Sequence, residues 1–542
     1  MKRRSFLGAG LLPAAVPPAG LLRAGSLFEG SRGHGPFRPY WESLKAYRTP
    51  EWFRDAKFGI WAHWTPQSVP EAGDWYARNM YIQGTPQYEH HVRTYGHPSR
   101  FGYKDICNLW KAERWKPDAL IRLYKRAGAE YLVAIANHHD NFDCWNSRHH
   151  VWNAVNVGPR RDIVGTWARA ARAQGLKFGV SYHGTPHRTW DEFMPVRYNS
   201  DRTGPFAGVP YDGRLTAGDG AGKWWSGLDP VSLNGPPHAK NSPCPEFVEH
   251  FLARVQDVID QYDPDMLTFD DGVKFSFDAG WAGAPDLGVW LGIPDLAPQI
   301  IAYYYNRNME RRGGRLEGVL NLKEVPEPVW RALTRDLEML VADKLQTEPW
   351  QLEACIGNWH YDRQLLATDG YKKPSLMIPM FVDIVSKNGN LLLSIPLPGH
   401  GEHDVAELAF LDEFAAWNAV NAEAIKGTRP WSIYGEGPST LPGANKVQSY
   451  QLDKLAFGAD DIRFTTRGTT LYAIALGWPA DGMVRIKALA QGASHYPRVI
   501  GAISLLGSHA DLKWSRGADA LEIRLPENKP CNHAFAFRIR AA

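Results

Sequence analysis

The chain has 542 residues, of which 44% are hydrophobic and 22% are charged, an ordinary composition for a globular protein. Its 61 basic and 58 acidic side chains nearly balance and form no long basic run, which argues against nucleic acid or an anionic membrane as a partner. The five cysteines are scattered, without a Cys-x-x-Cys pair, which argues against a zinc site or a dense disulfide framework. Trp, Tyr and Phe each occur 22 times, which fits either heavy core packing or stacking against sugar rings.

The first 30 residues have the pattern of an export signal. Arg3 and Arg4 follow Lys2 and precede a small apolar stretch that ends near Leu22, an order that resembles a twin-arginine signal. The stretch is short and contains prolines, so it does not predict a membrane span. We expect a signal peptide and flexible N-terminus over residues 1–30, and hence an exported protein, periplasmic or extracellular. A disordered tail is the alternative.

Between about residues 57 and 396, short apolar runs alternate with helical patterns. The runs are mainly apolar and do not alternate between apolar and polar residues, which is typical of strands buried on both faces. They are Phe58–Ala62, Tyr131–Ala136, Lys177–Tyr182, Met266–Phe269, Leu316–Leu320 and Leu391–Ile395. Apolar stripes predict helices over Arg161–Gln174 and Glu246–Tyr262. Repeated units of this kind favour a parallel barrel or a doubly wound sheet.

Two further regions differ from this pattern in their composition and in the elements that they predict. Residues 186–243 are rich in Gly, Pro, Asp and Trp and follow a predicted strand, so in a barrel this insertion would lie over the active face. After about residue 425, short strand-like segments such as Thr470–Leu476, Val499–Leu506 and Leu521–Leu525 are separated by turn residues. This pattern predicts a separate all-β domain over residues 425–542.

Reactive side chains occur where predicted strands end, which is where a barrel keeps its catalytic groups. His63 and Trp64 leave the first strand together, and His138 and His139 follow the second. Adjacent histidines are conceivable metal ligands, but their spacing matches no recognised zinc site. We therefore favour hydrogen bonding to sugar hydroxyls, with histidines bonded to backbone in the core as the alternative.

Two carboxylates are candidates for acid–base or nucleophilic chemistry. Asp270 ends an apolar strand, where it can attack an anomeric carbon if a second acid lies nearby; a loop-bonding aspartate is the default alternative. Glu353 stands among aromatic residues, and apolar surroundings raise a carboxyl pKa, as a general acid requires. A glutamate in a strand more often faces solvent.

Taken in order, the blocks resemble glycoside hydrolase family 29, the α-L-fucosidases. They read KFGIWAHW, RAGAEYLVAIANHHDNFDCW, RDIVGTWARAARAQGLKFGVSYH, YDPDMLTFDDG, VDIVSKNGNLLLSIP, GTRPWSIYGEGP and TTRGTTLYAIALGWP, and span about residues 40–540. The resemblance implies an α/β fold: a (β/α)8-type (TIM-like) barrel over residues 38–422, followed by a C-terminal antiparallel β-sandwich. It also implies an exo-acting retaining hydrolase that releases terminal α-L-fucose from a fucosylated oligosaccharide or glycoconjugate through a covalent glycosyl-aspartate, with no metal or organic cofactor.

The resemblance assigns roles to particular residues. Asp270 matches the family nucleophile, and Asp271 is the fallback. Sugar-binding or stacking roles fall on His63, Trp64, His138, His139, Tyr182 and Trp359.

Two departures from the family pattern concern charge. Where the family commonly has Trp-Glu, this chain has Trp350 followed by Gln351, and an amide cannot act as a general acid. Strand alternation places Glu353 on the same face as Gln351, so Glu353 is the candidate acid/base. The fallback candidates are Glu324, Asp74 and Glu71. Lys323 stands where many members have Arg, which keeps the charge but loses the two-pronged donor.

Two other functions stay open at this point. Gln351 motivates a non-catalytic fucose-binding protein on a hydrolase scaffold. An α-L-galactosidase is also open, because its substrate differs from a fucoside by one hydroxyl at C6 and an apolar pocket rejects an added hydroxyl only weakly.

Overall fold

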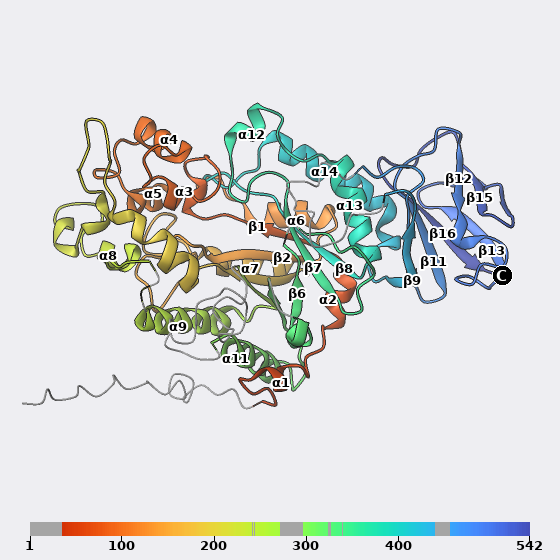
Figure 1. The fold of residues 1–542 in the computed structure, drawn as a ribbon, viewed down its shortest axis with the longest axis horizontal. Coiled ribbons are helices and arrows are strands. Elements are labelled where there is room, and N and C mark those ends of the chain that lie inside the picture. Colours follow the sequence, from red (N-terminus) through yellow and green to blue (C-terminus); the bar gives the residue numbers. More distant parts are fainter. Residues whose placement is uncertain are drawn as a thin grey trace, which may run out of the picture.

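The computed structural model describes residues 35–240, 242, 244–270, 296–323, 327–338, 340–439 and 456–542. The predicted signal peptide lies outside the described residues. Eight parallel strands close into a barrel in chain order (Figure 1), which confirms the barrel and rules out the doubly wound sheet. The strands are β1 (Phe58–Ala62), β2 (Tyr131–Asn137), β3 (Lys177–Tyr182), β4 (Met266–Phe269), β5 (Val319–Leu322), β6 (Thr334–Asp336), β7 (Trp350–Cys355) and β8 (Gly389–Ser394).

Apolar side chains fill the barrel interior. Trp61, Tyr131, Val133, Ile135, Met266, Val319 and Leu392 form one buried cluster there. Phe53 and Ala56 of helix α2 (Glu51–Ala56) belong to the same cluster, so α2 closes the end of the barrel where the strands begin. Polar side chains lie at the opposite end of the barrel, just past the carboxyl ends of the strands.

Helices cover the outside of the barrel, and both helices predicted from apolar stripes are confirmed. Helix α7 (Ile163–Ala173) begins after Asp162, whose side chain accepts a hydrogen bond from the Gly165 N–H, a standard N-cap. Helix α9 is Pro245–Tyr262. The other long helices are α6 (Pro117–Arg126), α11 (Leu296–Arg311), α13 (Pro374–Ser386) and α14 (Val405–Asn421). Among the described residues, no helix is both long and apolar enough to cross a bilayer.

The insertion after β3 folds as short turns against the β1–β2 connection. It contains η2 (Pro186–Phe193), η3 (Pro195–Tyr198), η4 (Asp212–Arg214), η5 (Ala217–Gly220) and α8 (Pro230–Asn234). The β1–β2 connection carries α3 (Tyr76–Asn79), α4 (Pro86–Thr94) and α5 (Tyr103–Leu109). Buried hydrogen bonds from Tyr81 to Asp212 and from Tyr88 to Asp201 join the two segments. Both segments emerge from the carboxyl ends of their strands (Figure 1) and therefore border the active face.

The C-terminal region is an antiparallel β-sandwich with its own core, as predicted. One sheet has the order β13-β16-β11-β10-β9 and the other β12-β15-β14. The strands are β9 (Arg429–Glu436), β10 (Ile462–Arg467), β11 (Thr470–Ala475), β12 (Met483–Ile486), β13 (Ile500–Leu505), β14 (Trp514–Arg516), β15 (Leu521–Arg524) and β16 (Phe535–Ala541).

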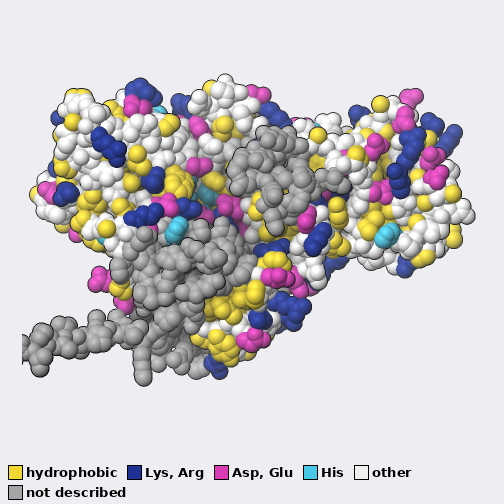
Figure 2. Space-filling model, viewed as in Figure 1, with side chains coloured by type: hydrophobic (Ala, Val, Ile, Leu, Met, Phe, Trp, Pro, Cys, Tyr) yellow, Lys and Arg dark blue, Asp and Glu magenta, His cyan; other side chains and the backbone are white. Residues whose placement is uncertain are grey.

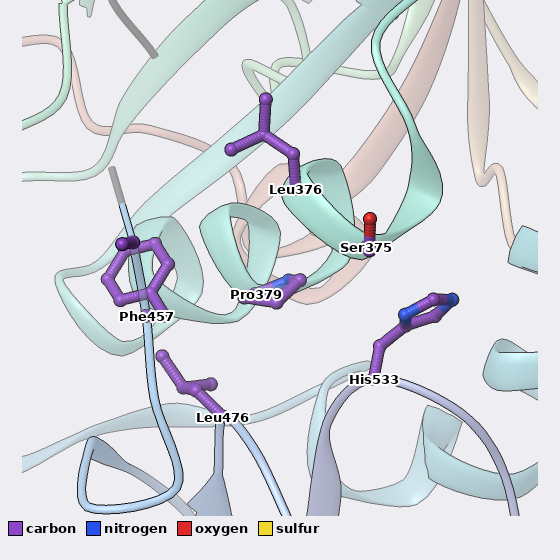
Figure 3. Close-up of a pocket in the computed structure, with 7 residues that line it drawn as sticks. Ser375, Leu376, Pro379, Phe457, Leu476 and His533 are labelled. Carbon is purple, nitrogen blue, oxygen red and sulfur yellow. The ribbon is translucent and has the colours of Figure 1, made fainter. Parts of the chain in front are cut away.

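The sandwich is fixed to the barrel by buried polar contacts. Arg463 of β10 forms a buried ion pair with Asp383 of α13, and the Trp417 indole N–H donates to the Ala534 carbonyl at 2.9 Å. A cavity of about 360 Å³ lies at this junction, lined by Ser375, Leu376, Pro379, Ala456, Phe457, Leu476 and His533 (Figure 3). It lies away from the carboxyl ends of the barrel strands. On the face in Figure 2, basic and acidic side chains are interspersed, in keeping with the balanced charge of the sequence.

Candidate active site

Polar side chains from five successive strands meet at the carboxyl end of the barrel. His63 follows β1, His138 follows β2, His183 follows β3, Asp270 follows β4 and Lys323 follows β5. Parallel strands bring these positions to one rim, whereas the chain keeps them far apart. The predicted histidines and the predicted nucleophile are therefore neighbours in space.

Asp270 is surrounded by hydrogen-bond donors. The His139 Nε2 lies 3.0 Å and the His183 Nδ1 lies 3.1 Å from its Oδ2, while the Lys323 ammonium contacts Oδ1. Burial alone would raise its pKa, but Lys323 and then His183 hold the pKa of Asp270 well below its usual value. The group is an anion whose side chain is still 21% exposed, which suits a nucleophile.

The protonation of the neighbouring histidines follows from their hydrogen bonds. Burial lowers the pKa of His183 to about 4, so its ring is neutral near pH 7. Its Nε2 accepts from the Ser181 hydroxyl, which leaves the proton on Nδ1, the atom that faces Asp270. His139 donates from Nδ1 to the His183 carbonyl at 2.7 Å, so both of its ring nitrogens face acceptors.

Four histidine rings form a packed cluster beside the nucleophile. Ring centroids are 5.5 Å apart for His63 and His183, 4.6 Å for His138 and His183, and 4.7 Å for His138 and His360. Burial lowers the pKa of His63 and of His138 well below its usual value. Neutral imidazoles each present one donor and one acceptor, which matches the needs of sugar hydroxyls.

The orientation of His138 is set by Gln67. The Ala77 N–H donates to Gln67 Oε1 at 3.2 Å, so Gln67 Nε2 is the atom that donates to His138 Nδ1, at 2.9 Å. The proton of His138 is therefore on Nε2. Sequence reasoning did not single out Gln67, because nothing in its immediate neighbours marks it.

The same side chains are close enough to be considered as metal ligands. Nitrogen atoms of His63, His138 and His183 lie within 4.8 Å of one another, as do ligand atoms of His139, His183 and Asp270. However, Gln67 already donates to one His138 nitrogen, and the Lys323 ammonium already neutralises Asp270. The expectation of a metal-free site stays a prediction.

Lys323 connects three carboxylates. Besides Asp270, its ammonium lies 2.8 Å from Glu338 Oε1 and 3.8 Å from Glu353 Oε2. Burial alone would lower its pKa, but Asp270, then Glu338 and Glu353, raise the pKa of Lys323 well above its usual value. Glu338 was missed from the sequence because β6, which precedes it, has only three residues and no apolar run.

Aromatic side chains border the site. Trp359 is partly exposed and contacts Trp61 and His63, with ring centroids 5.5 and 5.0 Å apart. Trp75, also partly exposed, has a left-handed backbone with φ of 60° and contacts His139 at 6.1 Å between centroids. A bulky residue at positive φ costs free energy, so the surrounding contacts hold Trp75 beside the site.

Two predicted sugar-binding residues lie elsewhere. The prediction that Trp64 contacts the sugar was wrong, because its indole is buried against Trp110 and Trp115 and donates to the Pro398 carbonyl. The prediction for Tyr182 was also wrong, because this side chain packs outward against Phe251 of α9 and Phe269. Both errors have the same cause, because consecutive residues at a strand end point to opposite faces. His63 and His183 take the inner positions.

The fallback acids have other roles. Glu71 pairs with the Arg363 side chain, and its carbonyl accepts from the Arg363 N–H at 3.1 Å. Asp74 accepts from the Trp359 and His360 N–H groups at 3.0 and 2.7 Å. These bonds join the β1–α3 and β7–α12 connections into one rim; α12 is Arg363–Ala367. Glu324 and Asp271 lie outside the described residues.

Comparisons with known proteins agree with this architecture. The family model for alpha-L-fucosidase matches residues 29–423, and the model for the alpha-L-fucosidase C-terminal domain matches residues 456–540. The chain is 26% identical over 504 residues to the tissue alpha-L-fucosidase of Homo sapiens, covering 91% of this chain and 89% of that protein. It is 25% identical over 527 residues to the human plasma alpha-L-fucosidase, covering 93% and 92% of the two chains.

A solved structure gives the same result. The Thermotoga maritima alpha-fucosidase in complex with fucose superimposes with a TM-score of 0.67 at 26% identity, covering 93% of this chain and 100% of that one. The barrel, the C-terminal sandwich and both family models thus agree over nearly the full length. The chain belongs to the alpha-L-fucosidase family of glycoside hydrolases.

Proposed function

We propose that this hydrolase releases terminal α-L-fucose from fucosylated glycans with retention of configuration, through a covalent intermediate on Asp270. The observation that carries the proposal is the setting of Asp270: an anionic carboxylate at the active rim, contacted by Lys323 and two histidines, with a second carboxylate on the far side of the same ammonium. This arrangement supplies both groups that a retaining glycosidase needs.

We assign the acid/base role to Glu338 in preference to Glu353. Glu353 is fully buried beneath Lys323, whereas the Glu338 side chain is 33% exposed and can meet a leaving group. Asp270 and Glu338 contact one nitrogen at no more than 2.8 Å, so their nearest oxygens are at most about 5.6 Å apart. Retaining enzymes hold their carboxyl groups about 5–5.5 Å apart and inverting enzymes about 6.5–9.5 Å. The separation supports retention.

The proposed reaction has two steps. An Asp270 oxygen bonds to C1 of fucose as the glycosidic C1–O bond breaks, and Glu338 gives its proton to the departing oxygen. Glu338 next takes a proton from water, whose oxygen bonds to C1 while the bond to Asp270 breaks. Lys323 opposes the negative charge of Asp270 before the first step and that of Glu338 once Glu338 has given up its proton. Neutral His63 and His138 bind the sugar hydroxyls, and Trp359 offers an apolar face.

The leaving group distinguishes the two acid candidates. Glu338→Ala should reduce kcat/KM on fucosylated oligosaccharides about 10²–10⁴-fold, the usual worth of general acid catalysis. It should affect an activated aryl α-L-fucoside far less, because that leaving group needs no proton. Azide should restore turnover of the aryl substrate and give α-L-fucosyl azide by attack on the covalent intermediate. Glu348→Ala, at an exposed position paired with Arg331, is the matched control.

Two outcomes would contradict parts of the proposal. If Glu353→Ala and not Glu338→Ala shows the dependence on the leaving group, the acid is Glu353. If the first product of wild-type hydrolysis is β-L-fucose by NMR, the mechanism is not retaining. An aryl α-L-galactoside measured in parallel tests the preference at C6.

We also propose that the protein is exported through its twin-arginine-like start. Arg3 and Arg4 carry this proposal. Replacing both by Lys should keep the chain in the cytoplasm with its full mass, and unchanged export of that variant would exclude the signal.

A further inference from the structure

Two carboxyl groups are buried together inside the barrel, below the nucleophile. Asp336 ends β6 and Glu353 lies within β7, and they are 2% and 0% exposed. Asp336 is in register with Gln351, two residues before Glu353, so all three side chains lie on the inner face. Gln351 donates to Asp336 Oδ2 at 3.2 Å and accepts from the Tyr131 hydroxyl at 3.0 Å.

The charges around this pair are unequal. Lys323, 3.8 Å from Glu353 Oε2, faces the pair from the end of β5, and Glu338 after β6 is a further carboxyl group in contact with Lys323. Tyr131 and Gln351 contribute neutral dipoles. One ammonium therefore faces Asp270, Glu338 and both buried carboxyls. Two neighbouring carboxyl groups in a dry site cannot both be charged at neutral pH without more cations.

Burial acts in the same direction on both groups. It raises the pKa of Glu353 well above its usual value, with the Asp336 carboxylate adding to the effect. Burial also raises the pKa of Asp336. Because the two carboxyl groups are buried together on the inner face, a proton that they hold belongs to the pair and not to either residue.

We propose that Asp336 and Glu353 share one proton and act as a positioning pair, whose single negative charge holds the Lys323 ammonium between Asp270 and Glu338. This inference rests on the proposed function of those two groups. Lys323 has a flexible stem and a point charge, so its position depends on the carboxylates around it. Asp270 and Glu338 hold it from one side, and the pair holds it from inside the barrel.

A pH dependence follows from the geometry. When the shared proton leaves at alkaline pH, the pair gains a second negative charge and attracts Lys323 more strongly. The ammonium then interacts less with Asp270, and transition-state stabilisation falls. Alkaline loss of activity should therefore persist with an activated aryl α-L-fucoside, whose departure needs no proton from Glu338.

Isosteric variants test how activity depends on the charge of the Asp336–Glu353 pair. Glu353→Gln and Asp336→Asn each remove the shared proton but leave one carboxylate beside a neutral amide. Each should lower kcat/KM on the activated aryl fucoside about threefold to tenfold and abolish its alkaline limb. The double variant removes the charge altogether. It should lose at least about tenfold more than the product of the two single effects, because the residues act as one unit.

A control variant and a second, spectroscopic measurement accompany this test. Glu407→Gln changes another fully buried glutamate, in α14, which pairs with His403 just before that helix, and should keep the wild-type pH profile. If the double variant does not fold by circular dichroism, infrared difference spectroscopy of the wild type should show one protonated buried carboxyl at neutral pH that is missing in Glu353→Gln.

Either of two results would overturn the inference. One is an alkaline limb that is unchanged in both single variants. The other is a wild-type spectrum at neutral pH without a protonated carboxyl signal that Glu353→Gln removes. The activated substrate needs no general acid, and any signal of Glu338 is common to the wild type and Glu353→Gln, so neither result depends on whether Glu338 is correctly assigned.

Discussion

Replacing Lys323 by methionine should test the electrostatic basis of the site. Methionine keeps an unbranched apolar stem of similar length and removes the charge. The Lys323 side chain is 8% exposed and that of Asp270 is 21% exposed, so the lost ion pair is largely buried. Asp270 keeps His139 and His183, but burial is no longer opposed by an ammonium. Its pKa should rise, and the acid limb of kcat/KM should move toward neutral pH.

The magnitude follows from the burial of the pair. Removing one partner of a buried ion pair costs about 3–5 kcal/mol, and loss of one preorganised electrostatic partner lowers kcat about 10²–10³-fold. In the wild type the pKa of Asp270 is depressed, so its pairing contributes stability that is present above the unfolded pKa and lost as pH falls through the folded pKa. The stability difference between wild type and Lys323→Met should therefore be largest at neutral pH and shrink on acidification.

The assay is the pH dependence of kcat/KM on an activated aryl α-L-fucoside, with urea unfolding at neutral pH and at about pH 4. Lys323→Arg keeps the charge and should keep the acid limb at low pH. Lys116→Met removes an exposed lysine and should match the wild type. A Lys323→Met enzyme that loses activity but keeps the wild-type acid limb would refute the claim that Lys323 holds Asp270 ionised.

Three further predictions concern the nucleophile, the histidine cluster and the domain junction. Asp270→Gly should lose at least about 10⁴-fold in kcat but still bind fucose, and azide should restore turnover with β-L-fucosyl azide as the product; near wild-type activity would move the role to another residue. His138→Ala should weaken fucose binding about tenfold by calorimetry, and a chelator should leave wild-type activity unchanged; loss reversed by a divalent ion would show a metal site. Arg463→Met should lower the free energy of unfolding by about 3 kcal/mol in urea, because Asp383 keeps Lys387 as a partner, and a normal midpoint would show that the pair is dispensable.

The parts of the fold visible in the sequence are those set by local apolar runs. Strands β1 to β4 are buried on both faces and mainly apolar, so their positions could be predicted. Strand β6 reads Thr-Arg-Asp over three residues and exists through its pairing with β5 and β7. No local pattern marks such a strand, and Glu338 after it was missed for the same reason.

The site was predictable to the strand end but not always to the residue. Asp270 and the paired histidines were found because they follow clear strands. Trp64 and Tyr182 were chosen at the right strand ends but on the wrong face. Alternation means that only one of two neighbouring residues points inward, and the bulges and turns at the strand end determine which residue that is. The contacts of Lys323 with Glu338 and Glu353 join three strands, and only the closed barrel shows them.

The rim formed by Asp74 with Trp359 and His360 has a consequence for biogenesis. Its two halves are 285 positions apart in the chain, and contacts of such long range form late, after the entropy of closing the intervening loop has been overcome. During synthesis, the rim beside the histidines of the first three strands cannot close until the residues that follow the seventh strand have been made. Fucose binding would thus report that this rim has formed, and a sugar-mimicking inhibitor added during refolding would stabilise only chains in which it has formed.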